Sequence, residues 1–491
     1  MNSQDIETVI EQQGKHLSRT TDHLGNLNKM LRDLQGFTTL AYELIQNADD
    51  VPDTTHIAFN ITDEALIVDN DGVFSDCGDV DAPECLWKDD PEKNHRCDFH
   101  RFRIIASADK RNQEGTTGAF GIGFTAVHQI TDHPELISQG RHWILSEDQK
   151  EDYRIRECPG CLRCKASDLP GTRFILPWAF DPDTPLRKAL DSSPVVPSNL
   201  DEFQAELENA LPTAMLFLKR LERAELRKSG ICLKLIQRVL YGNDLLINDG
   251  SQDYTWHLIK GNFDEEAAKL RLEYGEKIEP KWRANIKIAI PYDSNVNGVL
   301  CALMPTQTAT GFPFHINADF YPSSDRKNIS FEKDYQAAWN RAALRAAAEA
   351  LSEQFAELPG LIQADQIWKI ISSIYKVYRE TEEGEREHTL KNFWLQLAQN
   401  VNDMPIMFTS KGEWKKPCET ILLYREEEEQ ALSILESLKL DIIHATVRPY
   451  IFRLPRQEVF GISLLDFSDI IARLKAVGLT KLTNLNYSQK R

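Results

Sequence analysis

The stretch Glu43-Leu44-Ile45-Gln46-Asn47-Ala48-Asp49-Asp50 decides the fold and the site that the sequence predicts. Residues 31–48 contain no proline, and their apolar side chains recur at the spacing of one amphipathic helix. Because a helix stacks residues four positions apart on one face, Glu43 and Asn47 point the same way. Asn47 offers a neutral oxygen to a hard cation such as Mg²⁺, and Glu43 can deprotonate a water beside a phosphate. Taken alone, an exposed polar pair on a helix is the commoner explanation, so the surrounding motifs decide.

A β-hairpin is predicted directly after this helix, with strands over 56–61 and 65–68 and a turn at 62–64. The second strand runs into Asp69-Asn70-Asp71-Gly72. A carboxylate that leaves a buried strand can accept hydrogen bonds from an adenine amino group, and Gly72 lets backbone approach the base because it has no Cβ. A plain Asp-Gly turn is the alternative.

A glycine-rich segment over 115–124 leads into an apolar helical run over 124–130. Gly118, Gly121 and Gly123 can present successive backbone N–H groups to phosphates. No predicted strand directly precedes the segment, which argues against a Rossmann dinucleotide site, and the P-loop pattern G-K-[ST] does not follow it.

In this order, the three motifs resemble those of the GHKL ATPases, the Bergerat-fold superfamily that includes gyrase, heat-shock chaperones, histidine kinases and MutL. The residues around the third motif resemble those of the sacsin-type branch of this superfamily, because Ser-Ala-Asp-Lys-Arg at 107–111 precedes Gly-Ala-Phe-Gly-Ile-Gly-Phe at 118–124. The resemblance implies an α+β protein in which a Bergerat α/β sandwich binds Mg-ATP.

The resemblance also implies a role for each motif residue. Glu43 becomes the general base and Asn47 the ligand on the Mg²⁺ side, while Asp50 and Asp69 become carboxylates of the base pocket. The remaining implied contacts are backbone contacts from Gly72, Gly118, Gly121 and Gly123, a phosphate contact from Lys110 just before the lid, and support of Asp69 by the hydroxyl of Thr172.

Composition narrows the class of protein. The 491 residues are 42% hydrophobic and 27% charged, which suggests two to four globular domains. No apolar run is long enough to cross a bilayer, and residues 1–7 lack the basic and apolar parts of a secretion signal. We therefore expect an intracellular protein, cytoplasmic or nuclear, without a membrane partner. The net charge of −18 makes nucleic acid an unlikely partner, because phosphate contacts need clustered Lys and Arg.

Three cysteines, Cys158, Cys161 and Cys164, have the close spacing of a zinc knuckle. They lie between predicted strands at 153–156 and 172–176, so they sit at the tip of a hairpin. The candidates for a fourth ligand are Cys77, Cys85, Cys97, His95 and His100. Because no second CxxC pair is present, a structural zinc site and a loop of free thiols both remain open.

The chain divides into three predicted segments: 1–197 with the nucleotide site, an N-terminal helical arm and the lid, 198–358 as a mixed α/β second domain, and 359–491 as a helical and mixed C-terminal segment. The boundary near 197 rests on a stretch rich in Pro, Asp and Ser over 177–197. Strands are expected over 231–241, 254–259, 284–291 and 299–304, and an alanine-rich helix over 335–357.

The second segment contains two blocks, 311–320 and 323–328, that resemble the region after the ATPase domain of sacsin-type proteins. In the chaperone relatives a domain in this position supplies a cation to the γ-phosphate. Arg326 and Lys327 are therefore candidate catalytic cations, and a solvated turn is the alternative.

These expectations combine into a conformational switch of chaperone-like or scaffolding type that binds and hydrolyses Mg-ATP, with a protein client and a nucleotide-dependent dimer as candidate partners. The alternative is a nucleotide-binding interaction module with little or no turnover. A histidine kinase is disfavoured because no phosphoacceptor helix precedes the motifs, and a MutL-like or topoisomerase role is disfavoured by the acidic charge.

Overall fold

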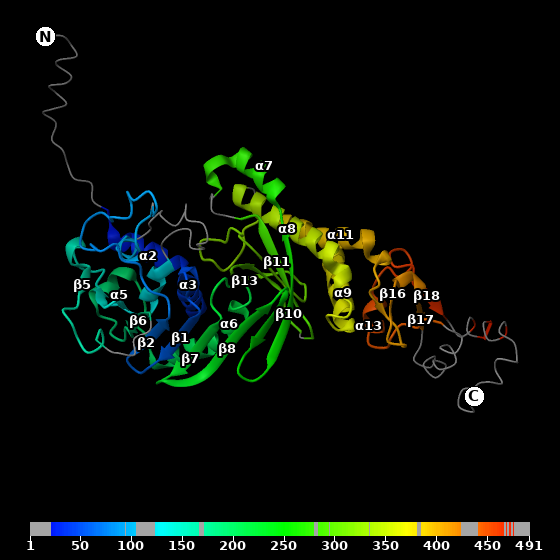
Figure 1. Cartoon of the computed structure of the whole chain (residues 1–491), viewed down its shortest axis with the longest axis horizontal. Coiled ribbons are helices and arrows are strands. Elements are labelled where there is room, and N and C mark those ends of the chain that lie inside the picture. The colour runs from blue at the N-terminus through cyan, green and yellow to red at the C-terminus, as the bar shows by residue number, and fades with distance from the viewer. Residues whose placement is uncertain are drawn as a thin grey trace, which may run out of the picture.

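One long sheet organises the molecule (Figure 1). The computed structural model describes residues 21–93, 95–104, 123–165, 171–278, 283–293, 295–332, 334–380, 384–423 and 440–465, together with the single positions 468, 471, 472 and 475. Within these residues, 14 strands pair in the order β13-β12-β14-β11-β10-β9-β8-β7-β1-β2-β6-β3-β4-β5. Most neighbouring strands are antiparallel, and helices are as substantial as strands, so the predicted α+β class is confirmed.

The N-terminal part of the sheet is built on the predicted hairpin. β1 (His56–Ile61) and β2 (Ala65–Asn70) pair antiparallel, and β6 (Thr172–Pro177) continues from β2. The outer strands are β3 (Glu135–Ser138), β4 (Arg141–Leu145) and β5 (Ile155–Glu157). The helices α3 (Phe37–Asp50) and α6 (Pro197–Ala214) and the 3-10 helix η2 (Gly123–Gln129) pack with these strands in one hydrophobic core. The helices α4 (Asp98–Phe102) and α5 (Pro185–Leu190) are shorter.

The helix expected over 31–48 is two helices, and this prediction is corrected. α2 (His23–Asp33) ends before Gly36, whose φ of 113° lies outside the helical region, and α3 begins at Phe37. Gln129 satisfies the backbone groups exposed at the break, because its Oε1 accepts from the Gly36 N–H at 2.7 Å and its Nε2 donates to the Leu34 carbonyl at 2.7 Å.

The second part of the sheet begins at β7 (Arg223–Lys228), which pairs parallel with β1. The strands that follow are β8 (Ile231–Tyr241), β9 (Asp244–Asn248), β10 (Asp253–Asn262), β11 (Asn285–Pro291), β12 (Val299–Ala302), β13 (Met304–Ala309) and β14 (His315–Ala318). The alanine-rich helix is α8 (Tyr335–Gln354), and with α7 (Asp264–Tyr274) it covers β10 and β11 (Figure 1). Every strand expected in this segment is present, with bounds shifted by a few residues.

His315 in β14 is buried, and its Nδ1 accepts a hydrogen bond from the Val299 N–H at 3.3 Å. This contact requires a neutral ring. Burial lowers the pKa of His315 to about 4, which agrees with that requirement.

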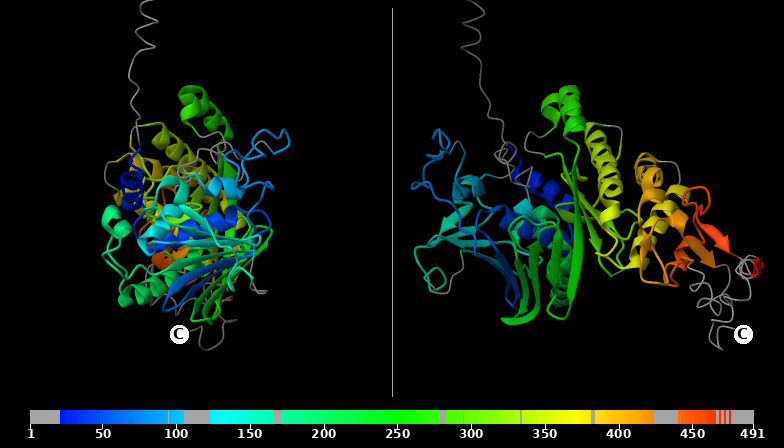
Figure 2. Two further views of the ribbon diagram at one scale, coloured as in Figure 1. Left: turned by 90° about the vertical axis from the view of Figure 1, so that its left-hand side faces the viewer. Right: turned by 45° about the vertical axis from the view of Figure 1, so that its right-hand side comes forward.

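The C-terminal part packs two of its helices, α10 (Glu385–Leu390) and α11 (Asn392–Asn400), against α8, while α9 (Ala364–Glu380) packs on α10, α11 and α13 (Arg448–Ile451) (Figure 2, right). Its strands are β15 (Met407–Phe408), β16 (Trp414–Lys415), β17 (Ile421–Leu423) and β18 (Ser463–Leu465). Short 3-10 turns are η3 (Glu151–Tyr153), η4 (Gly275–Lys277), η5 (Phe355–Glu357), η6 (Val401–Asp403) and η7 (Pro417–Glu419). No helix among the described residues is long and apolar enough to span a membrane.

Two large hydrophobic cores lie along the molecule. One spans residues from Leu34 to Met304, and the other spans residues from Ile259 to Ile462. The first core crosses the predicted boundary at 197 and the second crosses the one at 358, so these boundaries separate segments of chain and not hydrophobic cores. The division into 1–197, 198–358 and 359–491 stays a prediction about domain organisation.

Candidate nucleotide-binding site

A cavity opens between α3, β2, β6, α4 and η2, where the sequence predicts the nucleotide. Its polar lining comes from Glu43, Asn47, Asn70, Asp98, Arg101, Thr125, His128, Glu147, Thr172 and Arg326. Its apolar lining includes Val68, Phe74, Phe102, Phe124 and Phe174. Aromatic and aliphatic walls with a few convergent polar groups are typical of a small-molecule site.

Glu43 and Asn47 reach this cavity from the same face of α3, as their spacing predicts. The Glu43 side chain is buried, with 6% of its surface exposed. Gly123 lies against it so closely that a Cβ at this position would overlap the Glu43 carboxylate. The structure therefore brings the first and third motifs together at one carboxylate.

Arg326 reaches the same carboxylate from the second segment, because its guanidinium nitrogen bonds the Glu43 Oε1. Arg326 adopts a positive φ of 57° in a turn that Ser323 and Asp325 hold together: the Ser323 hydroxyl accepts from the Asn328 N–H at 3.1 Å, and Asp325 Oδ1 accepts from the Lys327 N–H at 2.9 Å. Lys327 does not line this cavity and faces the adjoining cleft instead.

The second motif supplies Asn70 to the cavity, whereas Asp69, the expected base-pocket residue, does not line it. Side chains alternate along a strand, so Val68 and Asn70 face the helices while Asp69 faces the other side of the sheet. There Asp69 forms a two-pronged ion pair with Arg173, its cross-strand neighbour, at 2.7 and 2.8 Å. The pairing occupies both carboxylate oxygens, and the side chain of this motif that lines the cavity is the carboxamide of Asn70.

Asp50, the other expected base-pocket carboxylate, also lies outside the cavity lining, and its carboxylate lies 3.9 Å from Lys219 Nζ. Its neighbour Asp49 is fully buried and accepts hydrogen bonds from the backbone N–H groups of Lys219, Arg220 and Leu221. This end of α3 is therefore a structural anchor for the chain that enters β7.

Gly72 and Thr172 lie beside Asn70, but the Thr172 hydroxyl does not bond Asp69, the partner expected for it. The Thr172 hydroxyl donates to the Gly72 carbonyl at 2.8 Å and lies 2.9 Å from the Ser138 hydroxyl. It is the cross-strand neighbour of Asn70 and supports the turn backbone, not Asp69. A Cβ on Gly72 would overlap the Thr54 hydroxyl, which explains the need for glycine here. Lys110, Gly118 and Gly121 lie outside the described residues.

Several cavity residues were not predicted from the sequence. His128 is buried at the end of η2, and its Nδ1 lies 3.2 Å from the Thr131 carbonyl. Burial lowers the pKa of His128, although the nearby Glu147 carboxylate raises it, so the ring is neutral and Nδ1 donates to that carbonyl. Glu147 also lines the cavity and pairs with His23 of α2 at 2.6 Å, which ties the N-terminal helix to the site.

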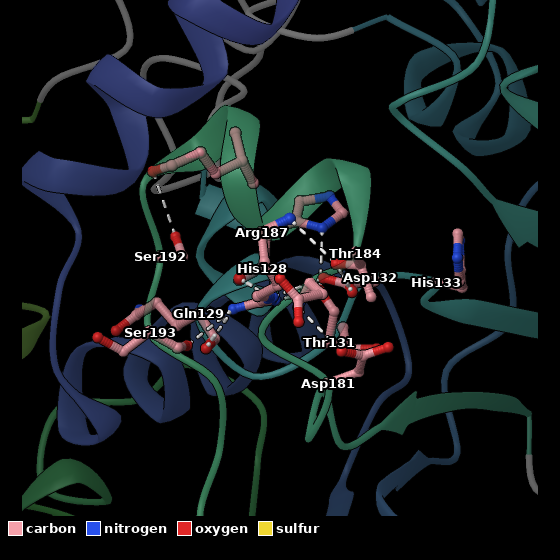
Figure 3. Close-up of polar contacts among 12 residues, drawn as sticks. His128, Gln129, Thr131, Asp132, His133, Asp181, Thr184, Arg187, Ser192 and Ser193 are labelled. Atoms are coloured by element: carbon pink, nitrogen blue, oxygen red, sulfur yellow. Dashed lines mark hydrogen bonds and ion pairs between the residues drawn. The ribbon is translucent and has the colours of Figure 1, made fainter.

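The end of η2 is fixed by Arg187, a fully buried arginine on α5 (Figure 3). Its Nε bonds Asp132 at 2.6 Å, and one terminal nitrogen donates to the carbonyls of His128 and Thr131 at 2.6 and 3.0 Å. The other terminal nitrogen donates to the Gln129 carbonyl at 3.1 Å. A cation at the C-terminal end of a helix satisfies its unpaired carbonyls and complements its dipole. No local motif marks this role.

A second, wider cleft adjoins the cavity at Glu43 and Arg326, which line both. It lies between α3 and the strands β11 to β14 and has a volume of about 770 Å³. Its cationic side chains are Lys219, Arg220, Arg283, Lys287, Arg326 and Lys327. Burial lowers the pKa of Lys287, and the positive charges of Arg238, Lys260 and Lys219 lower it further.

The cysteine cluster finds its fourth partner in His142, which was not among the five expected candidates. β4 pairs with β5, and the Cys158 N–H bonds the His142 carbonyl at 2.8 Å, so this strand brings His142 to the cysteines. The ligand atoms of His142, Cys158, Cys161 and Cys164 lie within 4.8 Å of one another. His142 Nδ1 lies 3.5 Å from the Cys161 sulfur, and its Nε2 lies 2.9 Å from Glu135.

Comparison with known proteins bears on the N-terminal part. Residues 21–153 match the family model described as Sacsin domain. This segment is similar to the sacsin domain. It contains α2, α3, the β1–β2 hairpin and β4, so it supplies Glu43, Asn47, Asn70 and Gly123, while Thr172 and Arg326 come from beyond it. The sacsin-type resemblance that the motifs predict is confirmed for this segment.

Protein NO VEIN of Arabidopsis thaliana is 24% identical to the chain over 319 residues, which cover 61% of this chain and 10% of that much longer protein. Among solved structures, the crystal structure of the B-subunit of DNA gyrase from Myxococcus xanthus is similar over 62% of this chain and 88% of that chain, with a TM-score of 0.30 and 9% identity.

Proposed function

We propose that the protein is a conformational switch of chaperone-like or scaffolding type that binds and hydrolyses Mg-ATP between its sacsin domain and its second segment. The observation that carries the proposal is the contact between Glu43 and Arg326, which are 283 residues apart in sequence. A general base for hydrolysis and a cation from another segment meet at one cavity wall. Nucleotide chemistry at this wall is thereby coupled to the arrangement of the two segments.

In the proposed mechanism, Asn47 would hold Mg²⁺ and Asn70 would contact the base, in accord with their places at the cavity. Glu43 accepts a proton from the water whose oxygen bonds the γ-phosphorus, the bond from that phosphorus to the bridging oxygen breaks, and ADP leaves. Arg326 turns from Glu43 to the transferring phosphoryl group in this step. A guanidinium there stabilises charge that develops in the transition state. The cationic cleft gives the phosphates a favourable field as they enter.

The same contact favours a second candidate function. While Arg326 pairs with Glu43, the base is held by a cation, so a protein in which this pair persists with nucleotide bound would bind ATP without turning it over. Such a protein is a nucleotide-dependent interaction module with a protein partner.

Arg326→Ala and Lys327→Ala separate these functions. Loss of Arg326 should lower hydrolysis on the order of a hundredfold or more and leave ATP affinity within a few-fold, because its cation acts in the transition state. Lys327→Ala is the comparison variant, since Lys327 lies next to Arg326 but lines the cleft and not the cavity, so its loss should affect nucleotide affinity more than turnover. Phosphate release and binding calorimetry with Mg-ATP are the measurements. Unchanged turnover in Arg326→Ala would remove the coupling element, and wild-type binding without any release would favour the interaction module.

We also propose that His142, Cys158, Cys161 and Cys164 hold a structural zinc ion. A tetrahedral site with Zn–S near 2.3 Å has sulfur atoms separated by about 3.8 Å, and Cys161 and Cys164 are 3.7 Å apart. Glu135 bonds the second ring nitrogen of His142, as carboxylates do behind zinc-bound histidines.

A further inference from the structure

A second group of metal-binding side chains lies between β2 and α4, apart from the Cys158 group. Cys77, Cys85, Cys97 and His100 place one ligand atom each within 4.8 Å of one another. Cys85, Cys97 and His100 are buried, and Cys77 is half-buried. We propose that these four residues hold a second structural zinc ion, which fixes the wall of the nucleotide cavity.

The distances suit tetrahedral coordination. With Zn–S near 2.3 Å and Zn–N near 2.0 Å, sulfur and nitrogen ligands are separated by about 3.5 Å. His100 Nδ1 lies 3.2 Å from the Cys97 sulfur and 3.5 Å from the Cys77 sulfur. The imidazole thus points its Nδ1 at the centre of the thiol group, as a ligand does.

The surroundings of the group also suit a metal. His100 Nε2 lies 3.1 Å from the Ala82 carbonyl, and a backbone carbonyl behind the second ring nitrogen orients a zinc-bound histidine. The Cys97 N–H donates to the Cys85 sulfur at 3.2 Å, a contact that stabilises a thiolate. Three thiolates and one imidazole are a ligand set that structural zinc favours.

The chain around this group is held by side-chain contacts and not by regular secondary structure. From residue 71 to residue 97, the described residues form no helix or strand. Ser75 braces the segment against α4, since its N–H and hydroxyl donate to Asp98 at 2.9 and 2.6 Å. A metal site at such a segment contributes folding free energy directly.

The position of the site links it to the nucleotide cavity. Cys97 immediately precedes α4, and His100 lies within it. The same helix supplies Asp98, Arg101 and Phe102 to the cavity lining. A zinc ion bound to these residues would fix the position of α4 and therefore that of the cavity wall that α4 forms.

The two cysteine groups are also joined through β4. Trp143 packs on Phe99 with ring centroids 5.0 Å apart, while the preceding residue, His142, faces the Cys158 group. Arg141 bonds Asp76 and Glu157, the residues just before Cys77 and Cys158.

Zinc content of the full-length protein, purified without added metal, tests the proposal. We expect two zinc ions per chain by elemental analysis, one from each group. Cys97→Ser and Cys161→Ser should each retain one, and Cys232→Ser, at an exposed thiol outside both groups, should retain two. Cobalt substitution should give thiolate-to-metal charge-transfer absorption that falls by about half in either single variant.

Differential alkylation of the wild-type protein keeps the test decisive if Cys97→Ser does not fold. Cys77, Cys85 and Cys97 should resist a thiol reagent in the zinc-loaded protein and react after a chelator removes the metal. The proposal is overturned if these thiols react equally before and after chelation, or if the only zinc is lost in Cys161→Ser. The proposal is also overturned if two of the three cysteines form a disulfide in protein purified under reducing conditions. The same holds if the protein contains iron with inorganic sulfide in place of zinc.

Discussion

Replacement of Arg187 by methionine should loosen the helix η2 that borders the nucleotide cavity. Arg187 is fully buried, Asp132 has only 8% of its side chain exposed, and their atoms are 2.6 Å apart. Met fills the space of the arginine stem but provides no donors, so Asp132 keeps Thr184 as its partner and loses its cation. The carbonyls of His128, Gln129 and Thr131 lose a donor as well.

The expected cost is about 3 to 5 kcal/mol, because removal of one member of a buried pair leaves an uncompensated charge. Amide hydrogen exchange over residues 123–132 is the suitable assay. With two hydrophobic cores, global unfolding need not be two-state, whereas exchange reports the local opening free energy. Nucleotide affinity should fall in the same variant, because His128 and Thr125 line the cavity.

Arg32→Met is the control, since Arg32 pairs with Asp191 on the surface with 63% and 79% of the two side chains exposed. Exposed pairs contribute about 0 to 1 kcal/mol, so exchange near η2 should not change. Asp132→Asn combined with Arg187→Met should recover part of the loss, because it removes the unpaired charge. A loss below about 1 kcal/mol in Arg187→Met would refute the role given to this network.

Three other predictions concern the site and the fold. Asn70→Ala should weaken ATP binding by about 1 to 3 kcal/mol while Asp69→Ala leaves it nearly unchanged, and the reverse order in calorimetry would restore Asp69 to the base pocket. Gly123→Ala should displace the Glu43 carboxylate and lower turnover without global unfolding, and normal turnover would mean that Glu43 is misplaced. The pKa of His315 is about 4 in the folded chain and about 6.5 in the unfolded chain, so the unfolded chain takes up the proton first as the pH falls. The free energy of unfolding should therefore fall by about 3 kcal/mol as the pH drops from about 6.5 to about 4. His315→Asn should flatten this pH dependence in denaturation experiments at several pH values, and an unchanged slope would show that another group causes it.

Local patterns in the sequence were sufficient for the hairpin, for the cavity face of α3 and for the strands of the second segment. The register of β2 was also readable in principle, because the alternation from Leu66 through Val68 places Asn70, and not Asp69, on the buried face. The motif resemblance drew attention to the carboxylate instead. The break at Gly36 was missed because the apolar spacing continues across it, and only the positive φ and the Gln129 contacts reveal it.

Contacts between distant parts of the chain could not be predicted from spacing. His142 reaches the Cys158 group only because β4 and β5 pair, and Arg187 reaches η2 only because α5 packs beside it. The sequence indicated Arg326 as a candidate cation but not that it bonds Glu43 across the molecule. Each of these depends on tertiary packing, which a local pattern does not encode.

The most direct test of the proposed chemistry is phosphate release by Glu43→Ala, measured together with Mg-ATP affinity. Glu43 lines the cavity beside Asn47 and contacts Arg326, so its loss should remove the proton acceptor and leave most nucleotide contacts in place. We expect ATP affinity within a few-fold of the wild type and hydrolysis reduced on the order of a hundredfold or more. Hydrolysis at the wild-type rate in Glu43→Ala would contradict the assignment of the base and, with it, the proposed mechanism.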